Sequence, residues 1–473
     1  MTTDHDRDGR IAYGLRRVAD ALTVSPPDPD QLRARAALPP RTPRFAVWQW
    51  PVLAAVAVLA VMATIALLPG LGVRGRGAAP AGPVDVPTLP TRFAGMSLLT
   101  APVSTAPPGP AVALYHQGSL GTRRGTTQVV VLGADGHTYR RLDLAEKRGA
   151  VGDDGEWSAA GALLAPDGSE VAVASADRLA DHLELVDLRS GVARAIPLGR
   201  SAAVRLLAWA PDGTRLAIAM LDGPLDGSPV TGRLAVLDLR DGRVQPVGTE
   251  QLTDVMLQAA VSPDGTMLAV PVGTGRVDLV DFSGAVRRSL TLPEGYYLDS
   301  PSAWSPDGRL LAVQYLGAVR GGLAFVDTTG SGGPVPAPLS RPEHPSELLG
   351  WTSDTTVLVG VEGSDYEIVQ RSVDGVTTRT VARLSQGVGR IARVSGLQLA
   401  GGLVPDLRIT EVGEVDRGPW PRWWLTLVVA FVVVIGLLVH RAVRRRAVRS
   451  STVSGSGRPT GPGPTGRTDR VDR

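Results

Sequence analysis

The chain has 473 residues, in which 49 Lys and Arg residues stand against 46 Asp and Glu residues, for a formal net charge of +3. It contains no cysteine, which excludes disulfide bonds, thiolate metal sites and a cysteine nucleophile. Arg and Asp are mixed through the middle of the chain instead of forming a basic face with aromatics between, so nucleic acid is not predicted as a partner. The length exceeds one ordinary core but suits a closed repeat array with appendages.

Residues 1–46 are predicted to be a cytoplasmic N-terminal segment with short amphipathic helices. Ile11, Leu15, Val18 and Leu22 recur at helical spacing, and a second short helix is expected over residues 28–38. These helices are expected to rest on lipid headgroups, to pack on themselves or to bind a cytoplasmic partner.

The first residues also match part of a calcium-binding loop. Asp4, Asp6 and Asp8 occupy alternate positions where an EF-hand places oxygen ligands, and Gly9 occupies its sharp turn. The twelfth position is Leu15 instead of the bidentate Glu, so no metal site is predicted here.

An almost wholly apolar run predicts a first transmembrane helix at residues 47–69. A helix needs about 20 apolar residues to span a bilayer, whereas a cleaved signal peptide has a shorter apolar region and is not usually preceded by such a long segment. The Gly-, Pro- and Ala-rich residues 70–90 are then predicted to be a linker.

One sequence motif repeats through the middle of the chain at a near-constant interval. Pro166, Pro211, Pro263 and Pro306 each begin a Pro-Asp-Gly turn and lie 45, 52 and 43 residues apart, and a degenerate copy follows at residues 351–354. This period is the size of one β-propeller blade. Proline, aspartate and glycine each favour a tight turn for a different reason, so every copy is predicted to join two antiparallel strands.

Each turn precedes a short apolar strand and then a strand that ends in aspartate with a glycine close behind. The first kind covers residues 171–174, 216–219, 268–270 and 310–313, and the second covers 183–187, 234–238, 277–281 and 323–327. This order resembles the Pro-Asp-Gly repeats of TolB-like and WD-type β-propellers, here in a two-span membrane protein of actinobacterial type. The resemblance implies an all-β propeller over residues 91–412. It implies no single function, because such propellers serve as binding platforms, enzyme halves and scaffolds.

The sequence predicts seven blades, with six as the alternative. Residues 111–136 are expected to form a first blade, and residues 351–375 a degenerate sixth. Residues 391–410 and 92–99 are expected to join into a seventh that closes the ring and removes its sheet edges. Closure from both ends would also bring the two transmembrane helices close together.

A second apolar run, with Trp420, Trp423 and Trp424 at its start, predicts a transmembrane helix at residues 420–440. Arginines follow this helix and precede the first one, which places both ends of the chain on the cytoplasmic side. The propeller is therefore expected outside the plasma membrane, with the lipid bilayer as one partner. Residues 441–473 are predicted to be a basic, disordered cytoplasmic tail.

The sequence predicts no catalytic, cofactor-binding or metal-binding residues. The histidines are scattered, and no Gly-x-Ser-x-Gly motif is present. A loose glycine pattern at residues 387–392 stands where a strand is expected instead of a helix. The motif aspartates are interpreted as turn caps and the motif tryptophans Trp209, Trp304 and Trp351 as blade-packing residues. Tyr296 and Tyr297, in a loop that breaks the repeat, are the candidate ligand contacts.

These features predict a non-enzymatic, membrane-anchored propeller that binds a protein or an envelope component outside the membrane. One alternative is a sensor that signals through residues 1–46, in the manner of a transmembrane anti-sigma factor. Another is an enzyme with its site in the propeller channel. That interpretation requires a cluster of ionisable side chains along the channel, and a channel of apolar and backbone groups alone would remove it.

Overall fold

The computed structural model describes residues 86–118, 128–148, 161–174, 179–223, 231–248, 252–253, 258–273, 275–315, 322–339, 346–385, 393–419, 431 and 434–442. The chain divides into two compact units, Val73–Val434 and Met1–Gly72 with Ile435–Arg473. The predicted cytoplasmic segment 1–46 and transmembrane helix 47–69 lie outside the described residues, as do most of 70–90, 420–440 and 441–473. Within the described ranges, no helix is long and apolar enough to cross a membrane.

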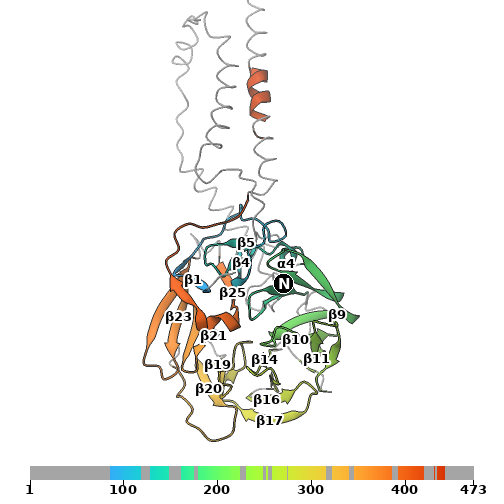
Figure 1. The fold of residues 1–473 in the computed structure, drawn as a ribbon, viewed down its shortest axis with the longest axis vertical. Coiled ribbons are helices and arrows are strands. Elements are labelled where there is room, and N and C mark those ends of the chain that lie inside the picture. The colour runs from blue at the N-terminus through green and yellow to red at the C-terminus, as the bar shows by residue number, and fades with distance from the viewer. Residues whose placement is uncertain are drawn as a thin grey trace, which may run out of the picture. The chain divides into compact units, whose positions relative to one another are not determined.

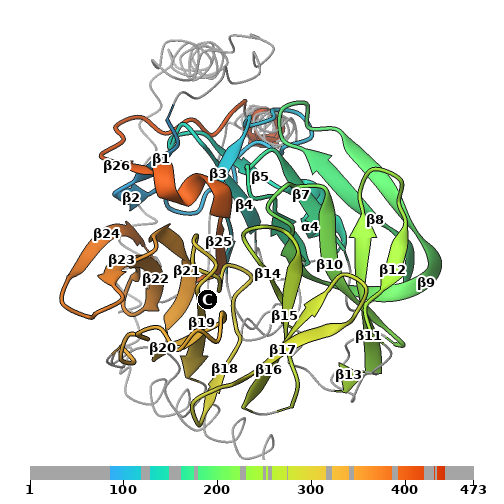
Figure 2. The same ribbon diagram turned by 60° about the horizontal axis from the view of Figure 1, so that its bottom comes forward.

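Strand pairing in the described part of Val73–Val434 produces six antiparallel blades arranged in a ring (Figures 1 and 2). Most blades have four strands, as expected for a propeller. The strands of blade one are β25 (Arg393–Leu399), β3 (Ala111–Gly118), β4 (Gln128–Gly133) and β5 (Tyr139–Arg141), and those of blade two are β6 (Ala162–Leu164), β7 (Glu170–Val173), β8 (Ala180–Asp187) and the first part of β9 (Ala193–Trp209).

The long strand β9 crosses from blade two to blade three, since its residues up to Ala202 pair with β8 and those from Ala203 onward pair with β10. Blade three continues with β10 (Arg215–Leu221), β11 (Thr231–Asp238), β12 (Val244–Pro246) and β13 (Leu252–Thr253); blade four contains β14 (Ala260–Val261), β15 (Met267–Pro271), β16 (Arg276–Asp281) and β17 (Val286–Thr291). Blade five contains β18 (Tyr296–Tyr297), β19 (Leu310–Tyr315) and β20 (Leu323–Asp327), and blade six contains β21 (Ser346–Ser353), β22 (Thr356–Glu362), β23 (Tyr366–Ser372) and β24 (Thr378–Leu384).

The hydrophobic core lies between blades. The apolar strands after the Pro-Asp-Gly turns are buried as predicted; β10, for example, buries every residue after Arg215. Each of six apolar clusters joins one blade to the next, and the ring closes through a cluster in which Leu358 and Ile368 of blade six meet Val130 and Tyr115 of blade one. The described strands therefore form a closed six-bladed ring.

The prediction of seven blades is wrong, and six, the alternative, is the number that the described residues form. Residues 391–410 do not build a blade of their own, because β25 pairs with β3 and supplies the inner strand that residues 111–136 lack. Residues 92–99, the expected partner segment, do not join residues 391–410 in one blade either. β2 (Arg92–Phe93) adds in parallel to the edge of β24, and β26 (Arg408–Thr410) pairs in parallel with β1 (Thr88–Pro90).

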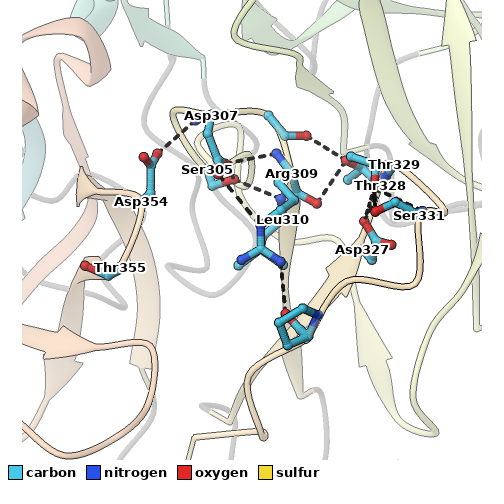
Figure 3. Close-up of polar contacts among 12 residues, drawn as sticks. Ser305, Asp307, Arg309, Leu310, Asp327, Thr328, Thr329, Ser331, Asp354 and Thr355 are labelled. Carbon is cyan, nitrogen blue, oxygen red and sulfur yellow. Dashed lines mark hydrogen bonds and ion pairs between the residues drawn. The ribbon is translucent and has the colours of Figure 1, made fainter.

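Each Pro-Asp-Gly copy forms the predicted turn. The four glycines Gly168, Gly213, Gly265 and Gly308 have φ values of 70°, 69°, 66° and 72°. In every copy the aspartate accepts a hydrogen bond at 3.0 Å from the backbone N–H two residues further on. In the degenerate copy, Asp354 accepts a hydrogen bond from the backbone N–H of Asp307 at 2.9 Å, so it links two blades (Figure 3). The interpretation of these aspartates as turn caps is confirmed.

The two ends of the propeller lie side by side. β1 and β26 pair with each other, and the segment that follows β26 lies against blade one. The Arg140 guanidinium is buried and binds the Asp416 carboxylate at 2.7 Å, while Arg417 donates hydrogen bonds to Gly95 O at 2.7 Å and Thr100 Oγ1 at 3.1 Å. The incoming and outgoing segments are thus fastened together.

Two shorter elements complete the described fold. The helix α4 (Asp143–Arg148) follows β5, and the 3₁₀-helix η2 (Gly401–Asp406) follows β25. A helix over residues 434–442 begins within the predicted span 420–440, and its side chains Val434, Ile435, Leu437 and Leu438 are exposed.

Candidate functional site: a cavity at the centre of the ring

The innermost strands of the blades surround a cavity of about 440 Å³. Figure 2 shows β14, β21 and β25 around the middle of the ring. The prolines of all four Pro-Asp-Gly turns also line this cavity. Each blade contributes at least one lining residue: Gln398 from blade one, Leu163 from two, Arg205 from three, Val261 from four, Asp299 from five and Glu347 from six.

Three of the lining residues, Arg205, Asp299 and Glu347, carry charged groups, among apolar side chains and a few uncharged polar ones. Arg205 lies on β9 and Glu347 on β21, and each stands four residues before a motif tryptophan in an apolar strand. Asp299 lies in the segment between β18 and Trp304. None of the three was predicted as a site residue, although the sequence holds a signal for two of them: a charged residue at a fixed place in strands that are otherwise built to be buried.

Glu347 is held by a tyrosine from two strands away. The Tyr366 hydroxyl, on β23, donates a hydrogen bond to Glu347 Oε1 on β21. Between them lies Gly360 of β22, which pairs directly with Glu347. A Cβ at Gly360 would stand 1.9 Å from the Tyr366 oxygen, so the tyrosine reaches the carboxyl only because position 360 has no side chain.

The pKa of Glu347 is raised to about 7 in total. Burial is the largest cause, the hydrogen bond from Tyr366 opposes it, and the negative carboxylates of Asp299 and Glu362 add to it. The pKa of Tyr366 is raised well above its ordinary value, first by burial and then by Glu347. Glu347 is therefore a carboxyl that gains and loses its proton close to neutral pH, and Tyr366 remains a hydrogen-bond donor.

A tethered loop supplies Asp299. Ser300 is buried and donates a hydrogen bond from its hydroxyl to Leu348 O on β21 at 3.1 Å. The same hydroxyl accepts a hydrogen bond from the backbone N–H of Ser302 at 3.1 Å. These bonds fix the loop across the inner strand of blade six, where the Asp299 charge acts on the Glu347 carboxyl.

Arg205 faces Asp299 from blade three. Its side chain is buried, and burial lowers its pKa, whereas the Asp299 carboxylate raises it. The positive charge of Arg205 and the negative charge of Asp299 therefore stabilise each other within the cavity wall.

Side chains from inner strands also join neighbouring blades. Gln398 of blade one accepts a hydrogen bond from Leu164 N at 3.0 Å and donates one to Ala162 O at 2.9 Å, both in blade two. The indole Nε1 of Trp209 donates to Leu163 O at 3.2 Å, and that of Trp304 donates to Ala260 O at 3.2 Å, each in the preceding blade. The motif tryptophans are buried, which confirms their interpretation as packing residues.

The two predicted contact residues form a strand instead of a loop. Tyr296 and Tyr297 make up β18, which pairs with Tyr315 and Gln314 of β19. Tyr296 is buried, with its ring edge-on to Tyr315 at 5.4 Å between centroids, and Tyr297 is partly exposed. Neither belongs to the cavity lining, although the same segment continues to Asp299 and Ser300, which do. Their role as ligand contacts stays a prediction.

Other sequence features add no chemistry to this cavity. In the parts of the chain that the structure describes, no group of three or more His, Cys, Asp or Glu side chains could hold a metal ion. The calcium-loop match at residues 4–15 and the glycine pattern at 387–392 lie outside those parts.

No protein-family model matches the chain. A search of curated proteins gives no match either. Among solved structures, the chain is similar to TolB from Acinetobacter baumannii, with 16% identity over 61% of this chain and 67% of that one and a TM-score of 0.39. It is similar to a putative TolB from Agrobacterium tumefaciens, with 14% identity over 61% and 99% and a TM-score of 0.35. A third is Kuenenia stuttgartiensis hydrazine synthase, with 16% identity over 49% and 94% and a TM-score of 0.29. The propeller itself is established by the strand pairing and the inter-blade clusters.

Proposed function

We propose that the chain is a membrane-anchored binding module whose propeller lies outside the plasma membrane and holds a protein or envelope ligand at its central cavity. The observation that carries this proposal is the cavity itself, to which every blade contributes lining residues and which contains Arg205, Asp299 and Glu347. Its volume of about 440 Å³ falls in the range of ligand sites, about 300–1,000 Å³. A propeller packed only for stability has no need of charged groups at its centre, where desolvation is costly.

The membrane anchor is proposed from the apolar runs at residues 47–69 and 420–440, each preceded or followed by arginines. Two observations support it. The propeller's incoming and outgoing segments are fastened side by side through Arg140, Asp416 and Arg417, which suits a domain tethered at both ends. The apolar side chains of the helix over residues 434–442 are exposed, as lipid contact requires.

The absence of cysteine permits a direct test of this topology. Val376, at the β23–β24 hairpin, is 80% exposed, and Val376→Cys should react in intact cells with a thiol reagent that cannot cross the membrane. Ser456→Cys, in the predicted tail, should react only after the cells are permeabilised. Protection of Val376→Cys in intact cells, with labelling after permeabilisation, would rule out the extracytoplasmic propeller.

A second candidate function is an enzyme, because the cavity contains the charged groups that catalysis would require. The enzyme interpretation requires ionisable groups along the channel, and Glu347 is one whose pKa of about 7 suits general acid–base work. Mass spectrometry of a compound that binds the cavity, before and after incubation with the protein, separates the two. Recovery of the compound unchanged supports the binding module, and conversion that Glu347→Gln abolishes would support the enzyme.

A further inference from the structure

The charges of the cavity are not balanced. Arg205 is the cation of the described lining, and its charge is opposed by Asp299. The described groups that act on Glu347 are the carboxylates of Asp299 and Glu362 and the hydroxyl of Tyr366, and no cation is among them. The wall formed by blade six therefore presents negative potential to whatever enters.

One oxygen of Glu347 is available to a ligand. The Tyr366 hydroxyl binds Oε1, and within the described ranges no donor reaches Oε2. The side chain is partly exposed, and the cavity is the space that it lines. A ligand that brings a positively charged hydrogen-bond donor would satisfy Oε2 and supply the missing charge together, and such charge-assisted bonds are about twice as strong as neutral ones.

We propose, building on the function proposed above, that the cavity binds the protonated primary amine of its ligand, with the Glu347 carboxylate as the anionic acceptor. A bare metal ion fits less well, because a hard divalent cation takes at least about six oxygen ligands and the described residues contain no group of three or more metal-binding side chains. An ammonium needs three acceptors. The leucines and prolines of the lining, such as Leu163 and Pro166, supply apolar surface for the rest of the ligand.

Binding and proton release are linked in this arrangement. Asp299, Glu362 and Tyr366 act on Glu347, and together with burial they leave its pKa at about 7. Only the carboxylate form accepts an ammonium ion pair, so affinity should rise as the pH rises through 7. For an alkylamine, which stays protonated over this range, one linked proton makes the affinity at pH 8 exceed that at pH 6 by about tenfold. The rise should be smaller for the α-amino group of a peptide, because its own pKa is about 8.

Isothermal titration of the full chain in nanodiscs tests the proposal with two amines and two neutral counterparts. n-Butylamine is compared with n-butanol, and triglycine amide with N-acetyl-triglycine amide. The proposal predicts binding of at least one amine and none of its neutral counterpart. Binding of n-butylamine alone identifies a small free amine, whereas binding of triglycine amide identifies the amine end of a peptide chain. Equal binding of amine and counterpart, or no binding of either amine, overturns the proposal.

The variant that decides the role of the carboxyl is Glu347→Gln, which should weaken amine binding at least tenfold at pH 8. Glu294→Gln, at an exposed position, is the matched control and should bind as the unaltered chain does. Tyr366→Phe keeps the carboxylate but removes a bond that lowers its pKa, so the pH midpoint of binding should move upward. Undiminished binding by Glu347→Gln, or an unmoved midpoint in Tyr366→Phe, contradicts the assignment.

The cysteine-labelling result separates failure of this inference from failure of the proposed function. If Val376→Cys is labelled in intact cells but the chain binds no amine, the extracytoplasmic placement stands and only the proposed ligand class is refuted. If Val376→Cys is not labelled in intact cells, the proposed placement is refuted, whichever ligand the chain binds.

Discussion

Replacing Gly360 by alanine should disturb the fold and the cavity together. A methyl group at position 360 would lie 1.9 Å from the Tyr366 oxygen and 2.6 Å from its Cζ. The tyrosine is 1% exposed and packed in the cluster that joins blades six and one, so its ring cannot move aside without opening that cluster. Overpacking of a core costs about 1–3 kcal/mol, and a buried group left without its hydrogen bond costs about 1–3 kcal/mol. We expect Gly360→Ala to lower the free energy of unfolding by about 2–5 kcal/mol.

Urea unfolding of the full chain in detergent micelles, followed by tryptophan fluorescence, measures this loss. Gly413→Ala is the control, because a Cβ there meets no atom within 4 Å. It should change stability by less than about 1 kcal/mol. Adding Tyr366→Phe to Gly360→Ala removes the closest contact and should restore part of the stability. If Gly360→Ala unfolds at the same urea concentration as the unaltered chain, Tyr366 does not reach Glu347 across position 360.

Three further outcomes follow from the contacts around the ring. Gln398→Leu removes the bonds to Leu164 N and Ala162 O, and should cost about 2–4 kcal/mol in the same urea assay; an unchanged midpoint would show that the ring closes without them. Trp304→Phe should cost about 1 kcal/mol more than Trp351→Phe, because Trp304 Nε1 binds Ala260 O whereas Trp351 Nε1 has no partner in the described part of the chain; equal costs would contradict this. The pKa of Glu347 is raised from 4.5 to about 7, so its contribution to stability is complete below pH 4.5 and is lost as the pH rises through 7. Glu347→Gln should flatten that slope between pH 5 and 8, and an identical slope would place the titration elsewhere.

The turns and strands were predictable from sequence because their causes are local. Proline, aspartate and glycine in consecutive positions specify a turn by their own backbone preferences, and the four copies formed it. The number of blades was not predictable in the same way. It depends on the pairing of β25 with β3, which lie near opposite ends of the propeller sequence. The apolar pattern of a strand does not specify which other strand it pairs with.

The cavity could be predicted only in part. Arg205 and Glu347 are charged residues in otherwise apolar strands, each four residues before a motif tryptophan, and this pattern is visible in the sequence. The contact between Glu347 and Tyr366 could not be read, because it depends on the register that places Gly360 between them. In the segment that breaks the repeat, Tyr296 packs into the core, because burying a large aromatic ring is more favourable than exposing it to solvent. The small polar residues after it, Asp299 and Ser300, line the cavity.

The charge and the placement of the cavity can be measured together in intact cells. Ser302→Cys puts a thiol in the cavity lining, and Val376→Cys puts one on an exposed hairpin as the reference. Their rates of reaction with a cationic and an anionic methanethiosulfonate, neither of which crosses the membrane, are compared. Coulomb's law gives about 0.8 kcal/mol in water for two unit charges about 5 Å apart, so one net negative charge at that separation would favour the cation and disfavour the anion by this amount each. The cation-to-anion rate ratio at Ser302→Cys should therefore exceed that at Val376→Cys by about tenfold. Equal ratios at the two positions, or labelling that appears only in permeabilised cells, would contradict an outward-facing, negatively charged cavity.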